Sequence, residues 1–225
     1  MTPQARLRQL AWQVGPPLLT LVLVLSVWQG AISLGKVSAF VLPSPLKVLA
    51  ALQDNLMPLV QAAWSTGVLA LEGFLLSLVT GILLAFLMAQ ARFLERSLFP
   101  YAIFLQTVPI IAIAPLLIYW CGPTPKAIVL VSFIISLFPI VTNATTGLAN
   151  PPREWLELLR LYHANWWAVL LKVRIPAAIP YIITGAKVSA GLSVVGAIVG
   201  EYFTGTAGRS HGLAYLILVN SENLR

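Results

Sequence analysis

Charged residues are scarce in this sequence, and their scarcity excludes a water-soluble globule. Only 9% of the 225 residues are charged, whereas 59% are hydrophobic, and the mean hydropathy is +0.88. A soluble protein of this size needs more polar side chains than this to cover its surface. The chain is therefore expected to lie in a membrane.

Reactive side chains are equally few. The one cysteine, Cys121, cannot form an internal disulfide, and the two histidines, His163 and His211, are far apart in the sequence. Neither a metal-binding His-Glu-x-x-His spacing nor a phosphate-binding Gly-x4-Gly-Lys-Ser/Thr loop occurs. The sequence predicts no metal, no cofactor and no catalytic site, so any ATP hydrolysis has to come from a partner.

Long uncharged runs predict an all-α, polytopic membrane protein. Crossing a hydrocarbon core of roughly 30 Å takes about 20 helical residues. Five segments meet that length: about 14–35, 62–90, 98–120, 126–148 and 176–200. The last apolar run, "HGLAYLILVN", is too short to cross, so a sixth span is expected to be missing at the C-terminus. The whole of 1–225 is predicted to form one transmembrane domain.

The basic residues predict the orientation, because Lys and Arg accumulate in cytoplasmic loops. Alternating spans place eight basic residues on one side and four on the other, which predicts a cytoplasmic N-terminus. The eight are Arg6, Arg8, Arg92, Arg96, Arg153, Arg160, Lys172 and Arg174, and the four are Lys36, Lys47, Lys126 and Arg209. The uncharged run of the first span is too long for a signal peptide, which favours an uncleaved anchor.

The predicted outer loop, 36–61, contains a helix signal. In "VLPSPLKVLAALQ", Ser44 can cap a helix whose first residue is Pro45. A short helix at the outer membrane interface is expected to follow.

The predicted cytoplasmic loop, 150–175, contains two helix signals. Asn150 is expected to cap a first amphipathic helix that begins near Pro151, and Asn165 a second one from Trp166 to about Lys172. Pro176 then opens the fifth span. The pattern alone leaves two functions equally open: an interfacial belt with tryptophans at the headgroups, or a docking surface for a partner.

Several motifs resemble one family of transport proteins. Glu157, Val173, Ile175 and Pro176 lie at the spacing of the loop signature of ATP-binding-cassette importer permeases. The stretches "LPSPLKVLAAL", "QTVPIIAIAPLLIYWCG", "SLFPIVTNATTGL" and "IPAAIPYIITGAKVSAGLSVVGAIVGEY" are similar to the branch for nitrate, sulfonate, taurine and bicarbonate, which includes vitamin-precursor permeases. Two positions depart from the signature: Leu158-Leu159 replace an alanine pair, and His163 replaces a glycine that would form a left-handed turn.

The resemblance implies a permease homodimer in a bacterial inner membrane. Two cytoplasmic ATPase subunits would drive it, and an external binding protein would deliver a small anion or a small vitamin precursor. ATPase docking is then expected on residues of the 150–175 loop: Glu154, Glu157, Leu158, Leu159, Tyr162, His163 and Ala164. The alternatives are an ion-coupled secondary transporter, which would need coupling carboxylates, and a membrane-embedded enzyme.

Polar residues within the spans are candidates for lining the substrate pathway, because helices broken at proline expose backbone groups to a cavity. These candidates are Gln106, Thr107, Asn143, Thr145, Thr146 and Lys187. Lys187 either lends positive potential to the pathway or pairs with Glu72 or with helix-end carbonyls, and the structural role is favoured. Structural roles are predicted for Pro176, Pro180, Gly196 and Gly200. Together with Gly191, Ser189, Ser193 and Ala197, these two glycines form a small-residue face for close helix packing, possible at a dimer interface.

Overall fold

The computed structural model describes residues 3–35, 41–90, 92–205 and 212–223. The chain divides into two compact units, Met1–Pro58 and Leu59–Arg225. All regular secondary structure in the described ranges is helical, so the predicted all-α class is confirmed. The single domain expected over 1–225 stays a prediction.

The first unit contains the helices α1 (Pro3–Ser33) and α2 (Pro45–Asp54). The apolar part of α1, Val14–Ser33, is long enough to span a membrane, and none of it is buried in the structure. Ser44 caps α2 as predicted, because its side chain accepts a hydrogen bond from the Lys47 amide (3.4 Å). The predicted outer loop ends earlier than residue 61, since the next helix begins at Leu56.

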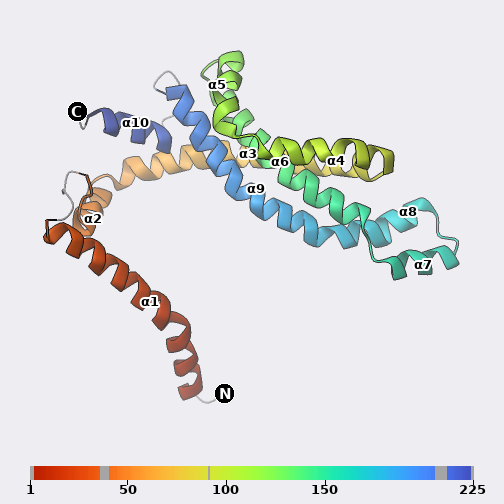
Figure 1. Cartoon of the computed structure of the whole chain (residues 1–225), viewed down its shortest axis with the longest axis horizontal. Helices are drawn as coiled ribbons and strands as arrows, with labels where there is room; N and C mark the ends of the chain where they lie inside the picture. The colour runs from red at the N-terminus through yellow and green to blue at the C-terminus, as the bar shows by residue number, and fades with distance from the viewer. Residues whose placement is uncertain (1–2, 36–40, 91, 206–211, 224–225) are drawn as a thin grey trace. The chain divides into compact units, whose positions relative to one another are not determined.

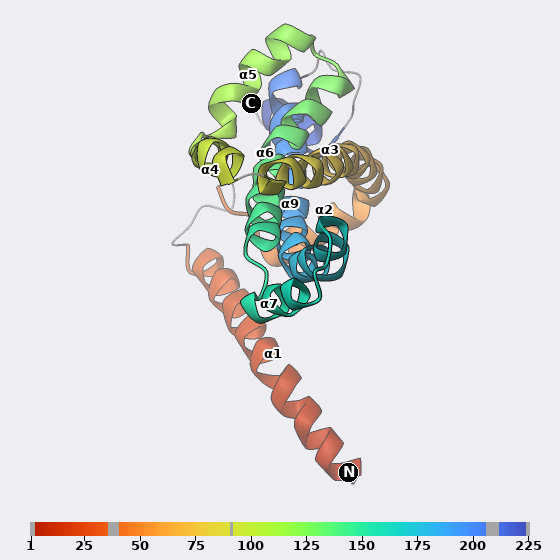
Figure 2. The ribbon, with the colours of Figure 1, turned by 90° about the vertical axis from the view of Figure 1, so that its right-hand side faces the viewer.

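Three long helices form the centre of the second unit: α3 (Leu56–Gln90), α6 (Pro125–Ala149) and α9 (Ile175–Thr204). One buried cluster joins Ala70, Ile128 and Ala197, and another joins Ala85, Ala144 and Ala178. The order of these contacts shows that α3 and α6 run parallel and that α9 runs antiparallel to both. Figures 1 and 2 show α6 and α9 side by side along their length.

Small residues let these helices approach closely. A Cβ added to Gly196 would lie 2.6 Å from Ser132 Cα, and one added to Gly200 would lie 3.0 Å from Ile128 Cα. The predicted small-residue face of α9 is thus used against α6 of the same chain. Gly191 differs from these glycines, because a Cβ there would meet nothing within 4 Å.

Serine side chains add hydrogen bonds between the three helices. The Ser136 hydroxyl donates to Ser77 Oγ of α3 (2.9 Å), and the Ser189 hydroxyl of α9 donates to the Ser136 carbonyl (2.6 Å). The Ser132 hydroxyl donates to the Ser193 carbonyl (2.8 Å). The bundle is therefore joined by polar contacts within its apolar interior.

The segment predicted as one span over 98–120 consists of two helices. They are α4 (Arg92–Thr107) and α5 (Ile110–Cys121), which meet at an angle of 95°. Pro109 explains the break: it has no amide hydrogen to donate, and its ring restricts Val108 to extended backbone. With the bent pair counted as one span, the described residues contain five candidate spans, and otherwise four. A further helix, α10 (Leu213–Asn223), follows α9.

The 150–175 loop differs from its prediction at two points. Asn150 ends α6, and its side-chain amide donates to the Thr146 carbonyl (3.1 Å), so Asn150 is not the cap of α7 (Arg153–Leu161). Asn165 does cap α8 (Trp166–Val169) by accepting from the Ala168 amide (2.8 Å). No second short helix stands apart, however, because a π-helix, η1 (Leu170–Arg174), joins α8 directly to α9.

Candidate functional site

A pocket of about 450 Å³ with several polar residues in its wall lies where the bent span meets α6 and α9. Three predicted pathway residues line it: Gln106 and Thr107 at the end of α4, and Asn143 on α6. The same wall includes Pro109, Pro139 and Thr142. The opposite side of the pocket is apolar and is formed by Val188 and Leu192 of α9. The break in the span and the part of α6 around Pro139 thus open onto the same space.

The pocket has both hydrogen-bond donors and acceptors. The Gln106 amide donates to Thr142 Oγ1 (2.9 Å), and the Asn143 amide donates to the Pro139 carbonyl (2.8 Å). Ile135 also lines the pocket. Its carbonyl accepts no hydrogen bond from residue 139, because proline has no amide hydrogen. Together these groups suit a small polar molecule that can both accept and donate hydrogen bonds.

The other predicted pathway residues do not line this pocket. Thr145 is fully buried, and its hydroxyl has no hydrogen-bond partner among the described residues. The Thr146 hydroxyl donates within its own helix to the Thr142 carbonyl (2.8 Å). Lys187 is exposed beside Val188, a residue of the pocket wall. Thr142 was missed in the sequence, although it directly precedes Asn143 in "TNATT".

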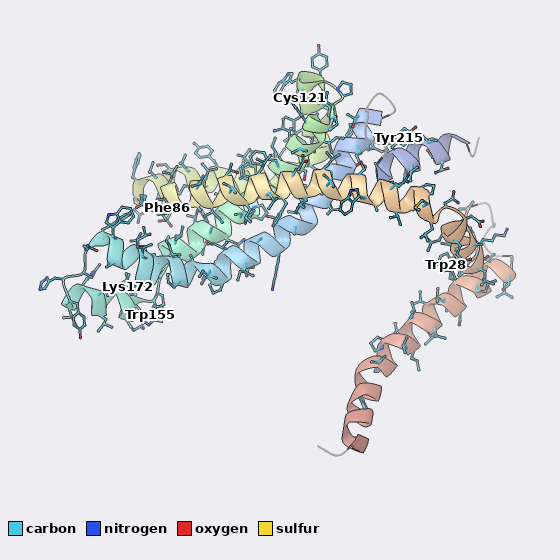
Figure 3. The ribbon with its side chains drawn as sticks, turned by 180° about the vertical axis from the view of Figure 1, so that it is seen from behind. Trp28, Phe86, Cys121, Trp155, Lys172 and Tyr215 are labelled. Atoms are coloured by element: carbon cyan, nitrogen blue, oxygen red, sulfur yellow. The ribbon has the colours of Figure 1, made fainter. Side chains whose placement is uncertain are left out.

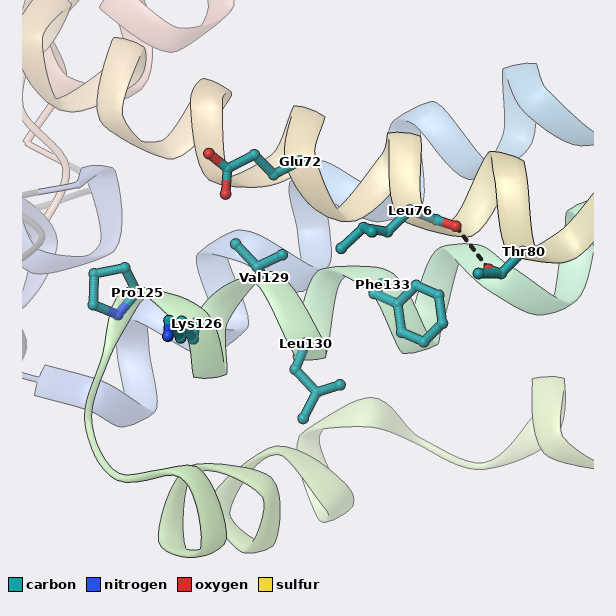
Figure 4. Close-up of a pocket in the computed structure, with 8 residues that line it drawn as sticks. All are labelled: Glu72, Leu76, Thr80, Pro125, Lys126, Val129, Leu130 and Phe133. Atoms are coloured by element: carbon teal, nitrogen blue, oxygen red, sulfur yellow. Dashed lines mark hydrogen bonds between the residues drawn. The ribbon is translucent and has the colours of Figure 1, made fainter.

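The predicted pair of Glu72 and Lys187 is wrong. Figure 4 shows Glu72 at a separate, mainly apolar pocket between α3 and the start of α6, which Lys126 and Val129 also line. Lys187 lies further along the bundle, because its neighbours Gly185 and Ser189 pack at Pro139 and Ser136. Both charged side chains are exposed, and neither makes an ion pair with a described residue.

The α7 helix presents an exposed surface at one end of the bundle. Glu154, Glu157 and Leu158 are exposed, and none of the nine residues of α7 is buried. A shallow hollow is lined by Glu157, Arg160, Leu161 and His163. Leu159 and Ala164, also predicted as docking residues, are half-buried, so they are less accessible than the rest.

The turn after α7 replaces the expected glycine with a left-handed histidine. His163 has φ = 49° and is the one non-glycine residue with positive φ in the described ranges. The Ala164 amide donates to the Leu159 carbonyl (3.0 Å), and the His163 amide donates to the Arg160 carbonyl (3.0 Å). These two bonds form a Schellman motif, in which glycine usually occupies the left-handed position.

Two prolines at the start of α9 contact the loop. Pro176 and Pro180 line a pocket together with Trp155 of α7 and Tyr181. Figure 3 shows Trp155 and Lys172 at this end of the bundle. The prolines therefore lie where the loop meets the span.

Residues 77–224 match the protein family described as "Binding-protein-dependent transport system inner membrane component". The match covers more than half of the chain. This chain belongs to that family. The permease is thus a multi-pass inner-membrane protein, the non-catalytic transport subunit of an ATP-binding-cassette importer, and it works with a separate ATPase and a binding protein.

Relatives of the permease carry related names. It is 34% identical over 206 residues to a probable ABC transporter permease of Haemophilus influenzae, covering 90% of this chain and 81% of the relative. It is 35% identical over 214 residues to the riboflavin transport permease RibX of Chloroflexus aurantiacus, covering 92% and 79%. A formylaminopyrimidine transport permease, ThiX of Halalkalibacterium halodurans, is 30% identical over 91% of this chain and 80% of its own length. The family fits the predicted importer and does not fit an ion-coupled transporter or an enzyme.

Proposed function

We propose that this permease forms a homodimer that imports a small anion or a small vitamin precursor. The support for the substrate class is the set of relatives, which are named as permeases for riboflavin, a formylaminopyrimidine, aliphatic sulfonates and nitrate. The polar pocket at Gln106, Thr107 and Asn143 forms part of the pathway, because it combines donors and acceptors beside a broken span. Lys187, which precedes Val188 of the pocket wall in the sequence, stays a candidate for the same pathway.

The α7 surface is proposed as the docking site of the ATPase, with residues 150–175 and the N-terminus in the cytoplasm. One observation carries this proposal: α7 is amphipathic and wholly unburied, yet the chain continues from it through α8 and η1 directly into a spanning helix. A partner bound to α7 can therefore displace α9. Glu157 accepts a charge-assisted hydrogen bond from a basic residue of the ATPase, while Leu158 and Tyr162 supply apolar contact.

The test is co-purification of the permease with its cognate ATPase. Glu157→Lys reverses the charge at the contact, and Leu158→Asp places a charge on its apolar part, so both variants should lose the complex while the permease still folds. Asp54→Lys makes the same charge change on exposed α2 and is the matched control. If both α7 variants retain the ATPase at the level of wild type and control, the loop is an interfacial belt and the docking proposal is wrong.

A further inference from the structure

The π-helix η1 forms the junction between the loop and α9. Helix α8, η1 and α9 form one continuous helical run, Trp166–Thr204, and η1 occupies Leu170–Arg174 within it. A π-helix widens the turn, shifts the side chains that follow, and is frequent at functional sites. Leu170 and Val173 of η1 are buried. The junction is thus packed into the bundle and is not a loose hinge.

Arg174, the last residue of η1, makes a hydrogen bond to a distant helix. Its Nη1 donates to the carbonyl of Ala89 (3.2 Å), one residue before the end of α3. The last carbonyls of a helix have no partner in that helix, and a cation is favourable there. Because the last turn of α3 has no basic residue of its own, Arg174 supplies that charge from another part of the chain.

The position of Arg174 is constrained. Its Nε is shielded from solvent and has no hydrogen-bond partner among the described residues. Arginines near helix ends usually extend toward water or headgroups. In Arg174, by contrast, Nε is shielded from water while Nη1 contacts α3. The side-chain geometry therefore favours the contact with α3 over solvation of the guanidinium.

A second polar contact joins the opposite ends of α3 and α9. Glu201 is 2% exposed, and its carboxylate accepts from the Thr66 hydroxyl of α3 (2.8 and 3.1 Å) and from the Ala214 amide of α10 (3.2 Å). The Leu213 amide donates to Thr66 Oγ1 (3.0 Å). A Cβ atom added at Gly212 would overlap the Glu201 carboxylate. Glu201 therefore caps α10 and holds α3 at the same time.

The two contacts lie on opposite sides of the membrane-spanning part. Thr66 and Ala89 are 23 residues apart on one helix, which corresponds to about 35 Å at 1.5 Å per residue. That length matches the thickness of a hydrocarbon core, roughly 30 Å. Helices α3 and α9 are thus joined near both membrane faces.

We propose that Arg174 makes α3 follow α9 when the loop is displaced, so that the two helices move as a rigid pair. The inference rests on the proposed function, in which the ATPase moves the loop. Helices α6 and α9 are covalently continuous with the loop, whereas α3 is separated from it by the bent span and α6. Among the described residues, the bond from Arg174 to Ala89 is the one hydrogen bond between the loop segment and α3. Arg174 is a positioning residue: it touches no substrate and connects the end of α3 to the loop segment.

The contact itself is tested in the permease alone, in lipid nanodiscs. Spin labels on Leu83→Cys of α3 and Leu171→Cys of η1, in a Cys121→Ser background, report the distance between the two elements, since both leucines are exposed. Arg174→Met keeps an unbranched apolar stem but removes the donors, so the distance distribution should widen about two-fold as the local contact opens. Arg174→Lys should restore a narrow distribution. Thr66→Val, which removes the contact at the far end of α3, is the matched control and should leave this distance unchanged.

Transport provides the second measurement, in liposomes containing the permease, the cognate ATPase and the binding protein. With Arg174→Met, substrate uptake per ATP hydrolysed should fall at least about five-fold, the lower end of typical coupling between sites. The ATPase should still co-purify, which distinguishes this loss from a failure of the docking proposal. If Arg174→Met does not accumulate, Arg174→Leu, which also carries no donor, replaces it in both measurements. A distance distribution as narrow as wild type, or unchanged uptake per ATP, would overturn the proposal.

Discussion

Replacing Gly196 by alanine tests how closely α6 and α9 are packed. The new Cβ would lie 2.6 Å from Ser132 Cα and 2.8 Å from Ile135 Cγ2. The Ile135 methyl can rotate away, but a backbone Cα cannot. Since carbon atoms are normally separated by about 3.5–4.0 Å, the two helices have to separate by about 1 Å.

The loss of stability follows from two contributions. Overpacking of a close-packed interface costs about 1–3 kcal/mol. Helix separation also stretches the hydrogen bond from Ser132 to the Ser193 carbonyl (2.8 Å), one turn away. Such a bond contributes about 0.6–1 kcal/mol between membrane helices. Gly196→Ala should therefore lower the free energy of unfolding by about 2–4 kcal/mol.

The assay is reversible unfolding in mixed micelles with increasing SDS, followed by tryptophan fluorescence. Gly191→Ala is the matched control, five residues away on the same helix, and its Cβ meets nothing within 4 Å. The control should change the free energy of unfolding by less than about 0.5 kcal/mol. The packing argument is refuted if Gly196→Ala is as stable as wild type. An equal loss in Gly191→Ala would show instead that another molecule covers that face.

Two further predictions concern the loop and its side of the membrane. His163→Gly should relieve the left-handed strain at this position, about 1 kcal/mol, and should slow amide exchange at Ala164 by up to about five-fold in hydrogen-exchange mass spectrometry. His163→Val should accelerate amide exchange at Ala164, because a β-branched residue disfavours positive φ. Faster exchange in the glycine variant would contradict the turn geometry. In intact cells of a Cys121→Ser background, an impermeant thiol reagent should label Lys126→Cys and not Arg153→Cys, because the two positions lie at opposite ends of the bundle. The reverse labelling would place the loop outside.

Local signals in the sequence predicted much of the fold. The uncharged runs predicted the long helices, and Ser44 and Asn165 were correctly identified as caps because capping depends on a few adjacent residues. Asn150 was assigned to the wrong helix, since an asparagine between two helices can serve either of them. A helix broken at proline was expected beside Gln106 and Thr107, because a proline inside an apolar run disfavours a straight helix, and the break lies at Pro109.

Contacts between distant segments could not be predicted. Glu72 and Lys187 were paired because charges are rare in the spans, but rarity gives no information on which helix faces which. Glu201, which contacts Thr66 across 135 residues, carries no local pattern that marks it as buried. The docking residues came from a resemblance and the pathway residues from polar positions within the spans, and the structure adds which of them are exposed and which share one pocket.

The serine contacts of the bundle have a consequence for how the chain enters the membrane during synthesis. The Ser77 hydroxyl donates to the Phe74 carbonyl of its own helix (2.8 Å), and the one proton of the Ser136 hydroxyl can go to the Ser132 carbonyl of its own helix (2.6 Å) in place of Ser77 Oγ. Each helix can therefore leave the translocon with these hydroxyl groups already paired, and it needs no partner helix to enter lipid. Helix α3 is synthesised well before α9, so we expect it to remain stable alone in the bilayer until α6 and α9 emerge and assemble with it.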